Sequence, residues 1–455
     1  MLRRRVGPKL TLKNSLQYES QRQDMNGNAL DGWLSRLETL HPNPIDLGLE
    51  RVAAVANTLG LLPLSVPVVT VAGTNGKGST VAVLEALLGD TGLLTGAYTS
   101  PHFWRFSERI RVGGEEAGDQ EVVAAFEAIE AARGATSLTY FEFATLAALL
   151  IFRARAVDVV VLEVGLGGRL DAVNVVNPSV AVITRIELDH QSWLGPDRDA
   201  IAREKAGIMR PAIPVVIGDA EPPATLLECA ADVGASPVLC LGEHFGYSGN
   251  NHRWRGFVQT SEGARQVLPE LVAGSLIPAN ICSAVQAALM LGVTVSDQQL
   301  SNALAQAQPR GRRERHVVAG REYVFDVSHN PSAVYKLVEY MNVTHCKGKT
   351  IAIFSAMDDK DIGAMIQAAQ DLFSAWFVAD QPLNARAAPA AEVASLLAEH
   401  GQQAISVSKN LRQAFRRAQA VMAEGDRLVV FGSFFTVAEV LPLLERDRCK
   451  AGAGA

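Results

Sequence analysis

Apolar and polar positions alternate along the chain in a pattern that predicts two series of strands and helices. From about residue 66 to residue 300, short Val- and Ile-rich runs precede segments with helical periodicity. Such runs are typical of strands buried on both faces of a parallel sheet. The pattern predicts strands at 66–71, 94–98, 157–164, 180–186 and 215–217, helices near 78–90, 119–133, 139–155, 199–209 and 278–292, and an antiparallel β insertion at 240–276.

A second series follows residues 308–315, which are rich in Pro, Gly and Arg and are predicted to form an interdomain hinge. We expect an α/β fold: a first domain at 25–307 with a mostly parallel sheet, and a doubly wound, Rossmann-like domain at 316–446 followed by a tail at 447–455. The second series predicts strands at 323–327, 350–354, 376–378, 404–407 and 427–431, and helices near 331–342, 361–373, 389–400 and 409–424.

The first 24 residues start with a basic cluster and continue as a polar segment. They lack the apolar core of a secretory signal. Two interpretations stay open. The segment is an extension without stable structure, with Met25 as an alternative start, or it is a transit peptide.

Composition narrows the classes of partner. The formal net charge is −6, and no long basic stripe is present, so we expect no nucleic acid partner. Five cysteines lack a C-x-x-C pair and metal-ligand spacing, which favours a reducing cytoplasm and no structural zinc. The apolar stretch at 146–152 is too short to span a bilayer, so we expect no membrane segment.

The segment 66–80 predicts a phosphate-binding loop, because an apolar strand leads directly into a glycine-rich turn. Three glycines allow the backbone to approach a phosphate, Lys77 supplies a charge, and Ser79 or Thr80 can reach a magnesium ion. The spacing departs from G-x-x-x-x-G-K-[ST], since Val71 and Gly78 stand where that motif needs glycine and a hydroxyl. The compact G-T-N-G-K-G-S form resembles the ATP loop of the Mur ligase superfamily. A glycine-rich turn without a ligand is the alternative.

Polar residues end several strands of the first predicted sheet, where ligands of open parallel sheets gather. Ser79, Ser100 and Glu163 would supply the hard oxygen ligands that magnesium prefers, although an ion pair between Glu163 and an arginine such as Arg169 is an alternative. His190 is a candidate ligand for a second metal or a loop histidine. From spacing alone, Lys205 is a solvated helix lysine.

Ten ordered blocks between about residues 28 and 443 resemble the bacterial folylpolyglutamate synthase family, especially its bifunctional dihydrofolate synthase form. The blocks are 46–51, 72–78, 99–102, 108–111, 138–142, 162–172, 189–190, 195–196, 203–208 and 325–331. The resemblance implies ATP-dependent ligation of L-glutamate to a pteroate or folate carboxylate through an acyl phosphate. Such chemistry requires neutralisation of crowded negative charge. It also implies a monomer acting on small molecules.

Site residues follow from the resemblance by position. Lys77, Glu163, His190 and Lys205 would be catalytic, and two magnesium ions are implied, with Lys205 as a carbamate. The implied metal ligands are Ser79, Ser100, Glu163, His190 and Lys205. The implied ATP contacts are Thr74, Asn75, Gly76, Lys77, Gly78, Ser79, Asn280, Arg312, Asp326 and His329. The implied pteroate pocket comprises Asp46, Leu47, Gly48, Leu49, Thr139, Tyr140, Phe141, Glu142, Leu170, Asp171 and Ala172, with Tyr140 and Phe141 able to stack on a flat ring.

Three positions depart from the family pattern. The hinge reads Pro-Arg-Gly-Arg-Arg at 309–313 where the family has Pro-Gly-Arg, which leaves the identity of the ATP-contacting arginine open. Ser328 replaces an alanine, and Phe435 replaces a histidine. These departures concern the glutamate side of the site.

Other functions remain compatible with the residues. The nearest are folylpolyglutamate synthase activity alone and a Mur-type ligase for another acid, although the block at 138–142 favours a pterin. A P-loop ATPase that switches conformation without ligation, and a kinase, belong to other classes.

Overall fold

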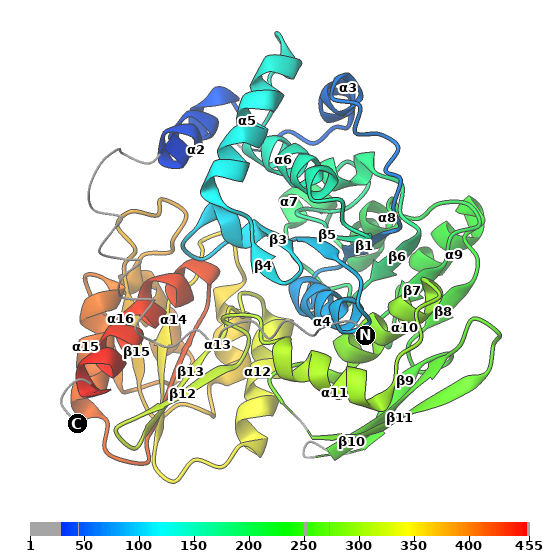
Figure 1. Cartoon of the computed structure of the whole chain (residues 1–455). Coiled ribbons are helices and arrows are strands. Elements are labelled where there is room, and N and C mark those ends of the chain that lie inside the picture. The colour runs from blue at the N-terminus through cyan, green and yellow to red at the C-terminus, as the bar shows by residue number, and fades with distance from the viewer. Residues whose placement is uncertain (1–28, 44, 250–252, 273, 453–455) are drawn as a thin grey trace.

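The computed structural model describes residues 29–43, 45–249, 253–272 and 274–452. The extension predicted at 1–24 lies outside the described residues. Two parallel-rich sheets, each covered by helices on both faces, form the molecule, with the first at the upper right of Figure 1 and the second at the lower left. The predicted α/β class, with a mostly parallel first sheet and a doubly wound second unit, is confirmed.

The first sheet has eight strands in the order β4-β3-β2-β5-β1-β6-β7-β8. The six strands from β2 to β8 in this order are parallel to one another, and β3 and β4 extend the sheet as an antiparallel edge next to β2. The strands are β1 (Val68–Ala72), β2 (Thr95–Tyr98), β3 (Ile110–Val112), β4 (Glu115–Glu116), β5 (Val159–Glu163), β6 (Val180–Ile183), β7 (Val215–Ile217) and β8 (Val238–Cys240).

Helices cover both faces of this sheet. One face packs against α4 (Lys77–Asp90), α10 (Pro278–Met290) and α11 (Asp297–Gln306). The other packs against α2 (Ala29–Leu40), α3 (Glu50–Thr58), α5 (Asp119–Arg133), α6 (Tyr140–Ala154), α8 (Arg198–Ala206) and α9 (Ala224–Val233). The short helices η1 (Phe106–Arg109), η2 (Ala172–Val175) and α7 (Gln191–Leu194) lie in its loops.

The predicted β insertion is a three-stranded antiparallel sheet of β9 (Gly246–Gly249), β10 (Arg253–Gln259) and β11 (Arg265–Val272). Trp254 and Leu268 from this sheet are buried in the same cluster as α10, which explains why one face of the small sheet is apolar.

The second sheet has six strands in the order β12-β13-β17-β14-β15-β16, parallel except for the edge strand β12. Its strands are β12 (Glu314–Val318), β13 (Arg321–Phe325), β14 (Thr350–Phe354), β15 (Trp376–Ala379), β16 (Ile405–Ser408) and β17 (Arg427–Phe431). One face carries α12 (Pro331–Val343), α13 (Ile362–Ala369) and α14 (Ala390–Glu399), and the other carries α15 (Leu411–Val421) and α16 (Phe434–Gly452).

Several predicted boundaries are wrong by three residues or more. The helices predicted at 199–209 and 409–424 end at Ala206 and Val421. The strand predicted at 180–186 ends at Ile183, because Arg185 pairs with Asn75 in an isolated bridge and Ile186 N–H bonds to Asp219. The helix predicted at 361–373 ends at Ala369. Helix α16 continues to Gly452, so residues 447–452 of the predicted tail are helical.

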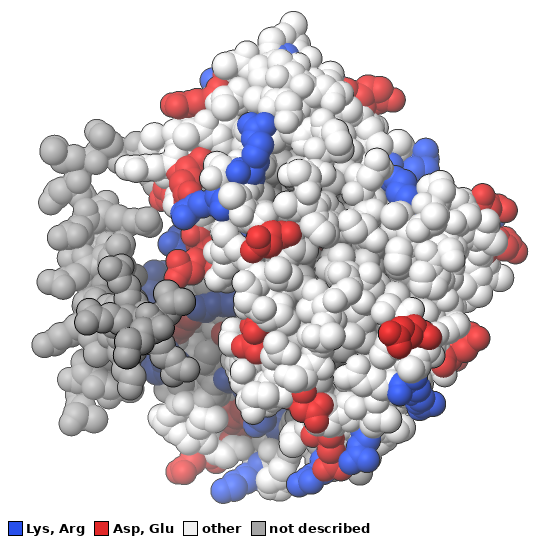
Figure 2. Space-filling view, turned by 45° about the vertical axis from the view of Figure 1, so that its right-hand side comes forward, with Lys and Arg blue, Asp and Glu red and all other residues white. Residues whose placement is uncertain are grey.

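Acidic and basic side chains are interspersed on the face shown in Figure 2, and neither sign forms a continuous field there. Within the described ranges, no helix is both long and apolar enough to cross a membrane. Each of the five cysteines is a free thiol.

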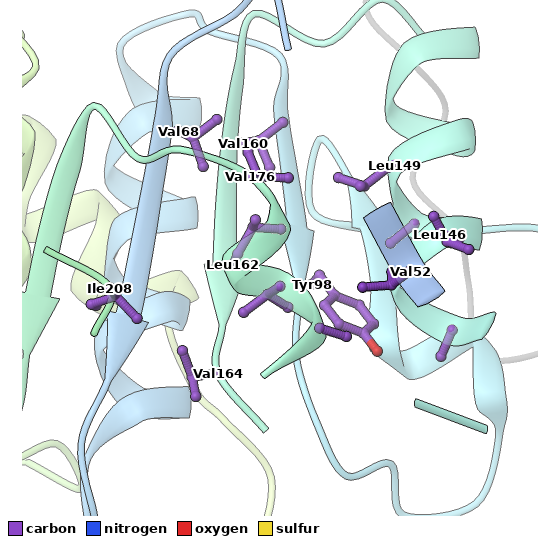
Figure 3. Close-up of a cluster of buried hydrophobic side chains, with 14 of the residues drawn as sticks. Val52, Val68, Tyr98, Leu146, Leu149, Val160, Leu162, Val164, Val176 and Ile208 are labelled. Carbon is purple, nitrogen blue, oxygen red and sulfur yellow. The ribbon is translucent and has the colours of Figure 1, made fainter. Parts of the chain in front are cut away.

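Alternate residues of the central strands enter two separate cores. Val68 and Leu162 belong to the cluster beneath α6, which Figure 3 shows with Tyr98 and Leu146, while Val69 and Val161 face α4 and α10. Successive side chains of these strands point to opposite faces of the sheet, and both faces are buried. Nearly every residue of a central strand is therefore apolar, which produces the continuous apolar runs in the sequence.

Candidate active site

The phosphate-binding loop predicted from the sequence joins β1 to α4. Gly73 has φ +145°, and a Cβ there would lie 1.7 Å from Thr184 Oγ1. Gly76 has φ +98°, and its Cβ would lie 2.5 Å from Asn280 Oδ1. Only glycine fits these positions, so the loop packs closely and leaves the first amides of α4 without helical partners, an arrangement suited to phosphate.

Lys77 begins α4 and turns back over this loop. Its Nζ donates to the carbonyls of Gly73 and Thr74 at 3.0 and 3.3 Å. Burial lowers the pKa of Lys77, and the charge of Glu163 opposes that shift. The ammonium group is therefore a charge held in a poorly solvated place, where an arriving anion would be bound strongly.

Glu163 ends β5 beside the start of α4 and is 4% exposed. Its Oε2 accepts from Ser100 N–H at 3.2 Å, and a Cβ on Gly78 would lie 3.6 Å from either carboxylate oxygen. Burial raises the pKa of Glu163, with the charge of Lys77 opposing it. The alternative ion pair with Arg169 is wrong, because Arg169 pairs with Glu204 at 2.8 Å.

Lys205 is a buried residue of α8, so the solvated helix lysine expected from spacing is wrong. It is 4% exposed, and its Nζ donates to Gly73 O at 3.0 Å. Burial, together with the charge of Lys77, lowers the pKa of Lys205 to about 7. Among the described residues no carboxylate lies within ion-pair distance of this amine. Sequence periodicity missed this because α8 presents Lys205 toward the loop after β1.

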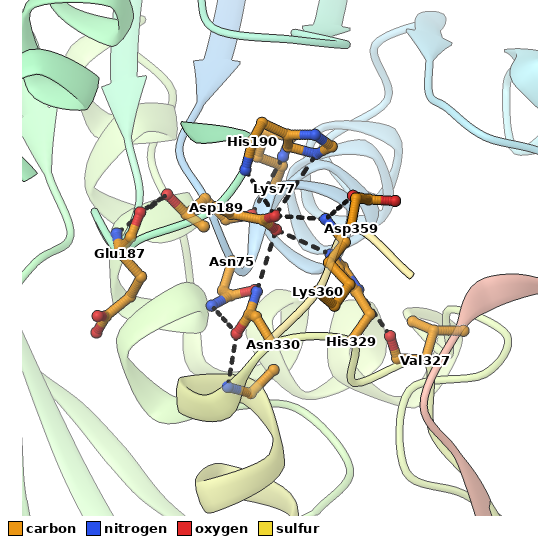
Figure 4. A network of polar contacts seen from close by, with 12 residues as sticks. Asn75, Lys77, Glu187, Asp189, His190, Val327, His329, Asn330, Asp359 and Lys360 are labelled. Atoms are coloured by element: carbon orange, nitrogen blue, oxygen red, sulfur yellow. Dashed lines mark hydrogen bonds and ion pairs between the residues drawn. The ribbon is translucent and has the colours of Figure 1, made fainter. Parts of the chain in front are cut away.

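His190 and Asp189 follow β6 and face the second sheet's domain (Figure 4). His190 has φ +51°, and burial lowers its imidazole pKa to about 4. Burial alone would raise the pKa of Asp189. The hydrogen bond from His329 and the charges of His190, His329 and Lys360 instead hold that pKa well below its usual value.

Asp189 is the meeting point of the two domains. Its carboxylate forms ion pairs with Lys360 and with His329 Nε2, the latter at 3.2 Å, and accepts from Asn330 Nδ2 at 3.3 Å. Asn330 also caps α12 and exchanges two hydrogen bonds with Asn75 of the loop, at 3.0 and 3.2 Å (Figure 4). The second domain is thus fixed against the phosphate-binding loop.

Two adjoining cavities open at this junction. The smaller, about 290 Å³, is lined by residues of both domains, and the larger, about 710 Å³, extends along the outer face of α4. Both volumes suit small-molecule ligands. Both cavities are lined by Gly78, Ser100, Glu163 and Arg312, and the smaller also by Thr74, Asn75, Gly76, Lys77, His190, Lys205, His329, Lys360 and Arg386.

Three predicted nucleotide or metal residues line neither cavity. Ser79 is buried one residue beyond Gly78, and Asn280 packs against Gly76. Asp326 accepts from the backbone of Arg313 and Ser328 at 2.9 Å each, so it fixes the loop between the domains.

The blocks predicted to form the pteroate pocket come together on the α6 side of the sheet, and also line neither cavity. Thr139 and Glu142 form the capping box of α6, and Asp171 caps η2. Arg51 pairs with Asp46 and Glu142 at 3.0 and 3.2 Å, which joins the first two blocks. Burial raises the pKa of Asp171 to about 6, although three backbone hydrogen bonds to its carboxylate act to lower that pKa. Phe141 packs over Gly165, a residue lining the smaller cavity.

Comparisons with known proteins agree with this geometry. Residues 71–225 match the Mur ligase middle domain, and residues 311–434 match the Mur ligase, glutamate ligase domain. The dihydrofolate synthase/folylpolyglutamate synthase of Escherichia coli (strain K12) is 41% identical over 420 residues, covering 92% of this chain and 96% of that protein.

Solved structures give the same result. E. coli FolC in complex with DHPP and ADP superimposes with a TM-score of 0.86 at 39% identity, over 93% of this chain and 100% of that chain. A bifunctional folylpolyglutamate synthase/dihydrofolate synthase with Mn, AMPPNP and L-glutamate bound has a TM-score of 0.81 at 38% identity, over 92% and 100%.

The chain belongs to the dihydrofolate synthase/folylpolyglutamate synthase family of Mur ligases. The predicted enzyme class, an ATP-dependent ligase, is confirmed. In this family member, the phosphate-binding loop and the buried acid lie where both domains meet.

Sequence reasoning missed Lys360 and Arg386, two cations from the second domain that line the smaller cavity of this ligase. Both follow strand ends: Lys360 lies in the loop after β14, and Arg386 in the loop after β15. The rule that ligands gather at the carboxyl ends of parallel strands, applied to the second sheet, would have found them.

A separate group with metal-ligand chemistry lies outside the site. Ligand atoms of Cys240, Glu243 and His244 lie within 4.8 Å of one another, although the sequence showed no such spacing. His244 Nδ1 accepts from Cys240 N–H at 3.2 Å, so one ring nitrogen is already engaged in shaping the turn.

Proposed function

We propose that the chain adds L-glutamate to dihydropteroate and to reduced folates, serving folate biosynthesis and polyglutamylation. The acceptor carboxylate attacks the γ-phosphorus of ATP, which gives an acyl phosphate and ADP. The glutamate amine then attacks the acyl carbon, and phosphate leaves as the amide forms. Support comes from relatives of that name, solved with ADP or AMPPNP, with DHPP or with L-glutamate, and from the cavity between the domains.

For ATP, we assign the phosphates to the loop and the start of α4. Residues Thr74 to Gly78 line the smaller cavity, and Lys77 lies among them. Arg312 lines both cavities, which supports it as the ATP-contacting arginine of the altered hinge. His329 contributes from the second domain, so bringing the domains together would complete the site.

The donor set beside the loop fits a hard divalent cation. Glu163 is a buried carboxylate whose nearest hydrogen-bond donor is one backbone amide, and Ser79 and Ser100 offer hydroxyl oxygens. Bound there, magnesium would neutralise charge on the phosphates. Deprotonated Glu163 would hold it, and Lys77 would balance the remaining negative charge of the phosphates.

A second ion would involve His190 and Lys205. Lys205 donates to Gly73 O from a buried position without an acid partner, which suits a role other than an ion pair. As a carbamate it would become an anionic oxygen ligand in the smaller cavity, which His190 also lines. Mass measurement of the intact protein under native, carbonate-containing conditions would test the modification.

For the acceptor, we retain the pocket predicted at 46–49, 139–142 and 170–172. Support comes from the ion pairs of Arg51 that join two of these blocks and from the contact of Phe141 with the edge of the smaller cavity. A domain boundary within 308–315, action as a monomer and a cytoplasmic location, without nucleic acid or membrane partners, belong to the same proposal.

The incoming glutamate needs cations for its carboxylates, and Lys360 and Arg386 supply them on the second-domain wall. We predict that Arg386→Ala raises the KM for L-glutamate by about 10- to 100-fold, because a charge-assisted hydrogen bond is lost. The KM for ATP should stay within about threefold. Steady-state kinetics checks this, with Arg416→Ala, an exposed arginine of α15, as the matched control. An unchanged KM for glutamate would exclude Arg386 from this role.

The observation that carries the proposal is the convergence of Lys77, Glu163 and Arg312 on one cavity shared by both domains. Purified protein with ATP, magnesium and L-glutamate should release phosphate only when dihydropteroate or tetrahydrofolate is present. Each product should be heavier by one glutamyl unit. Phosphate release without acceptor would contradict ligation, and extension of folate alone would reduce the activity to folylpolyglutamate synthase.

A further inference from the structure

Arg109 ends η1 and is surrounded by neutral groups. Its Nε donates to His102 Nδ1 at 2.7 Å, and its guanidinium carbon lies 5.4 and 5.9 Å from the ring centres of Tyr140 and Phe106. It also reaches the hydroxyl of Tyr98, a fully buried residue. Over the described ranges, no carboxylate forms an ion pair with this half-buried arginine.

The neighbouring Arg111 shows the usual arrangement for an arginine withdrawn from solvent. Arg111 donates from Nε and Nη2 to both oxygens of Glu85, at 2.6 to 3.1 Å. Arg109 is two residues away and lacks such an acid. A guanidinium held by aromatic rings and a neutral imidazole keeps most of its attraction for an anion, because no resident carboxylate neutralises it.

Arg109 lies between the two halves of the proposed acceptor site. On one side, its carbonyl accepts from Thr99 N–H at 2.9 Å, and the next residue, Ser100, donates to Glu163 in the proposed metal site. On the other side, it contacts Tyr140 of the pteroate block. Arg109 itself lines neither cavity, so an acceptor held by that block would meet this cation on the side of Tyr140.

The two proposed acceptors differ in charge at this point. Dihydropteroate has one carboxylate, which reacts. A folate has two on its glutamyl group, and one of them stays free during the reaction. We propose that Arg109 binds the free carboxylate of the folate glutamyl group, so that it acts in chain extension and is dispensable for the dihydrofolate synthase reaction. This inference rests on the proposed function.

The test compares both reactions in the same protein samples. Arg109→Gln keeps a donor for His102 and removes the charge. We expect kcat/KM for tetrahydrofolate to fall about 10- to 100-fold and that for dihydropteroate to change less than about threefold. Arg109→Lys should recover part of the loss, and Arg155→Gln, a variant of an exposed arginine paired with Glu121, should change neither.

A substrate analogue gives an independent check. Tetrahydropteroyl-4-aminobutyrate keeps the side-chain carboxylate and lacks the other, so wild type and Arg109→Gln should use it equally slowly. Equal losses with dihydropteroate and tetrahydrofolate, or no loss with either, would overturn the proposal, as would an analogue that wild type uses as fast as tetrahydrofolate. If Arg109→Gln does not fold, Arg109→Lys and the analogue decide. A wild type that forms neither product would instead refute the proposed function.

Discussion

Lys77→Ala is expected to lower kcat with either acceptor by at least about 100- to 1,000-fold, the effect of removing one preorganised charge or donor from a reacting group. The ammonium lies over the phosphate-binding loop and lines the smaller cavity. In that poorly solvated place its attraction for phosphate charge is strong, and water cannot replace it. Single-turnover measurement of acyl transfer, with product mass as readout, checks the expectation.

The fold should survive this substitution. Burial lowers the pKa of Lys77, so keeping its charge in the folded chain is costly without a ligand. Removing this charge also takes away the main cation beside the buried Glu163, so the two effects oppose each other, and we expect the nucleotide-free variant to fold with a melting temperature close to that of wild type. Its stabilisation by ATP should be largely lost. Lys336→Ala, a variant of a helix lysine paired with Glu339, is the control. Turnover within a few fold of wild type would refute the assignment of this loop to the phosphates.

The fold could be predicted from the sequence wherever local signals decide the structure. The strands at 350–354 and 427–431 and the helix at 119–133 have the predicted bounds, because apolar runs set the strands and Glu121, which accepts from Gly118 N–H, stabilises the start of the helix. Helix α16 was missed because Pro442 lies inside it and usually ends a helix. The overrun of β6 could not be foreseen, since a tertiary pairing between Asn75 and Arg185 ends it.

Residues of the candidate site could be predicted only where a single segment of sequence contains both the structural signal and the functional side chain. The glycine turn before Lys77 and the acid ending β5 carry their own signal, and the cavity joins them as expected. Lys205 carries none, because its burial depends on how α8 meets the first loop, and Lys360 carries only its place after β14, because its burial depends on how the second domain meets Asp189. The role proposed for Arg109 could not be predicted either. It depends on the absence of an ion-pair partner among the described residues, and sequence spacing does not show which acids lie near a side chain in the fold.

The substitution Glu163→Gln should weaken magnesium binding without disturbing the fold. The amide has nearly the shape of the carboxylate, and its oxygen can still accept from Ser100 N–H, so the site should keep its structure. We expect the magnesium concentration for half-maximal activity to rise at least about 10- to 100-fold, as for losses of metal-site contacts, and kcat at saturating magnesium to fall as well.

The reason lies in charge. Burial raises the pKa of Glu163, so the carboxylate is stabilised chiefly by cations, of which Lys77 is one and the proposed metal would be the stronger. Without metal, the variant should melt at the same temperature as wild type or higher, because a poorly solvated charge has been removed. Magnesium titrations followed by activity and by melting temperature measure both effects, with Glu121→Gln, whose parent carboxylate pairs with Arg155 at the surface, as the control. A normal titration in Glu163→Gln would remove this residue from the ligand set and leave its burial to be explained by Lys77 alone.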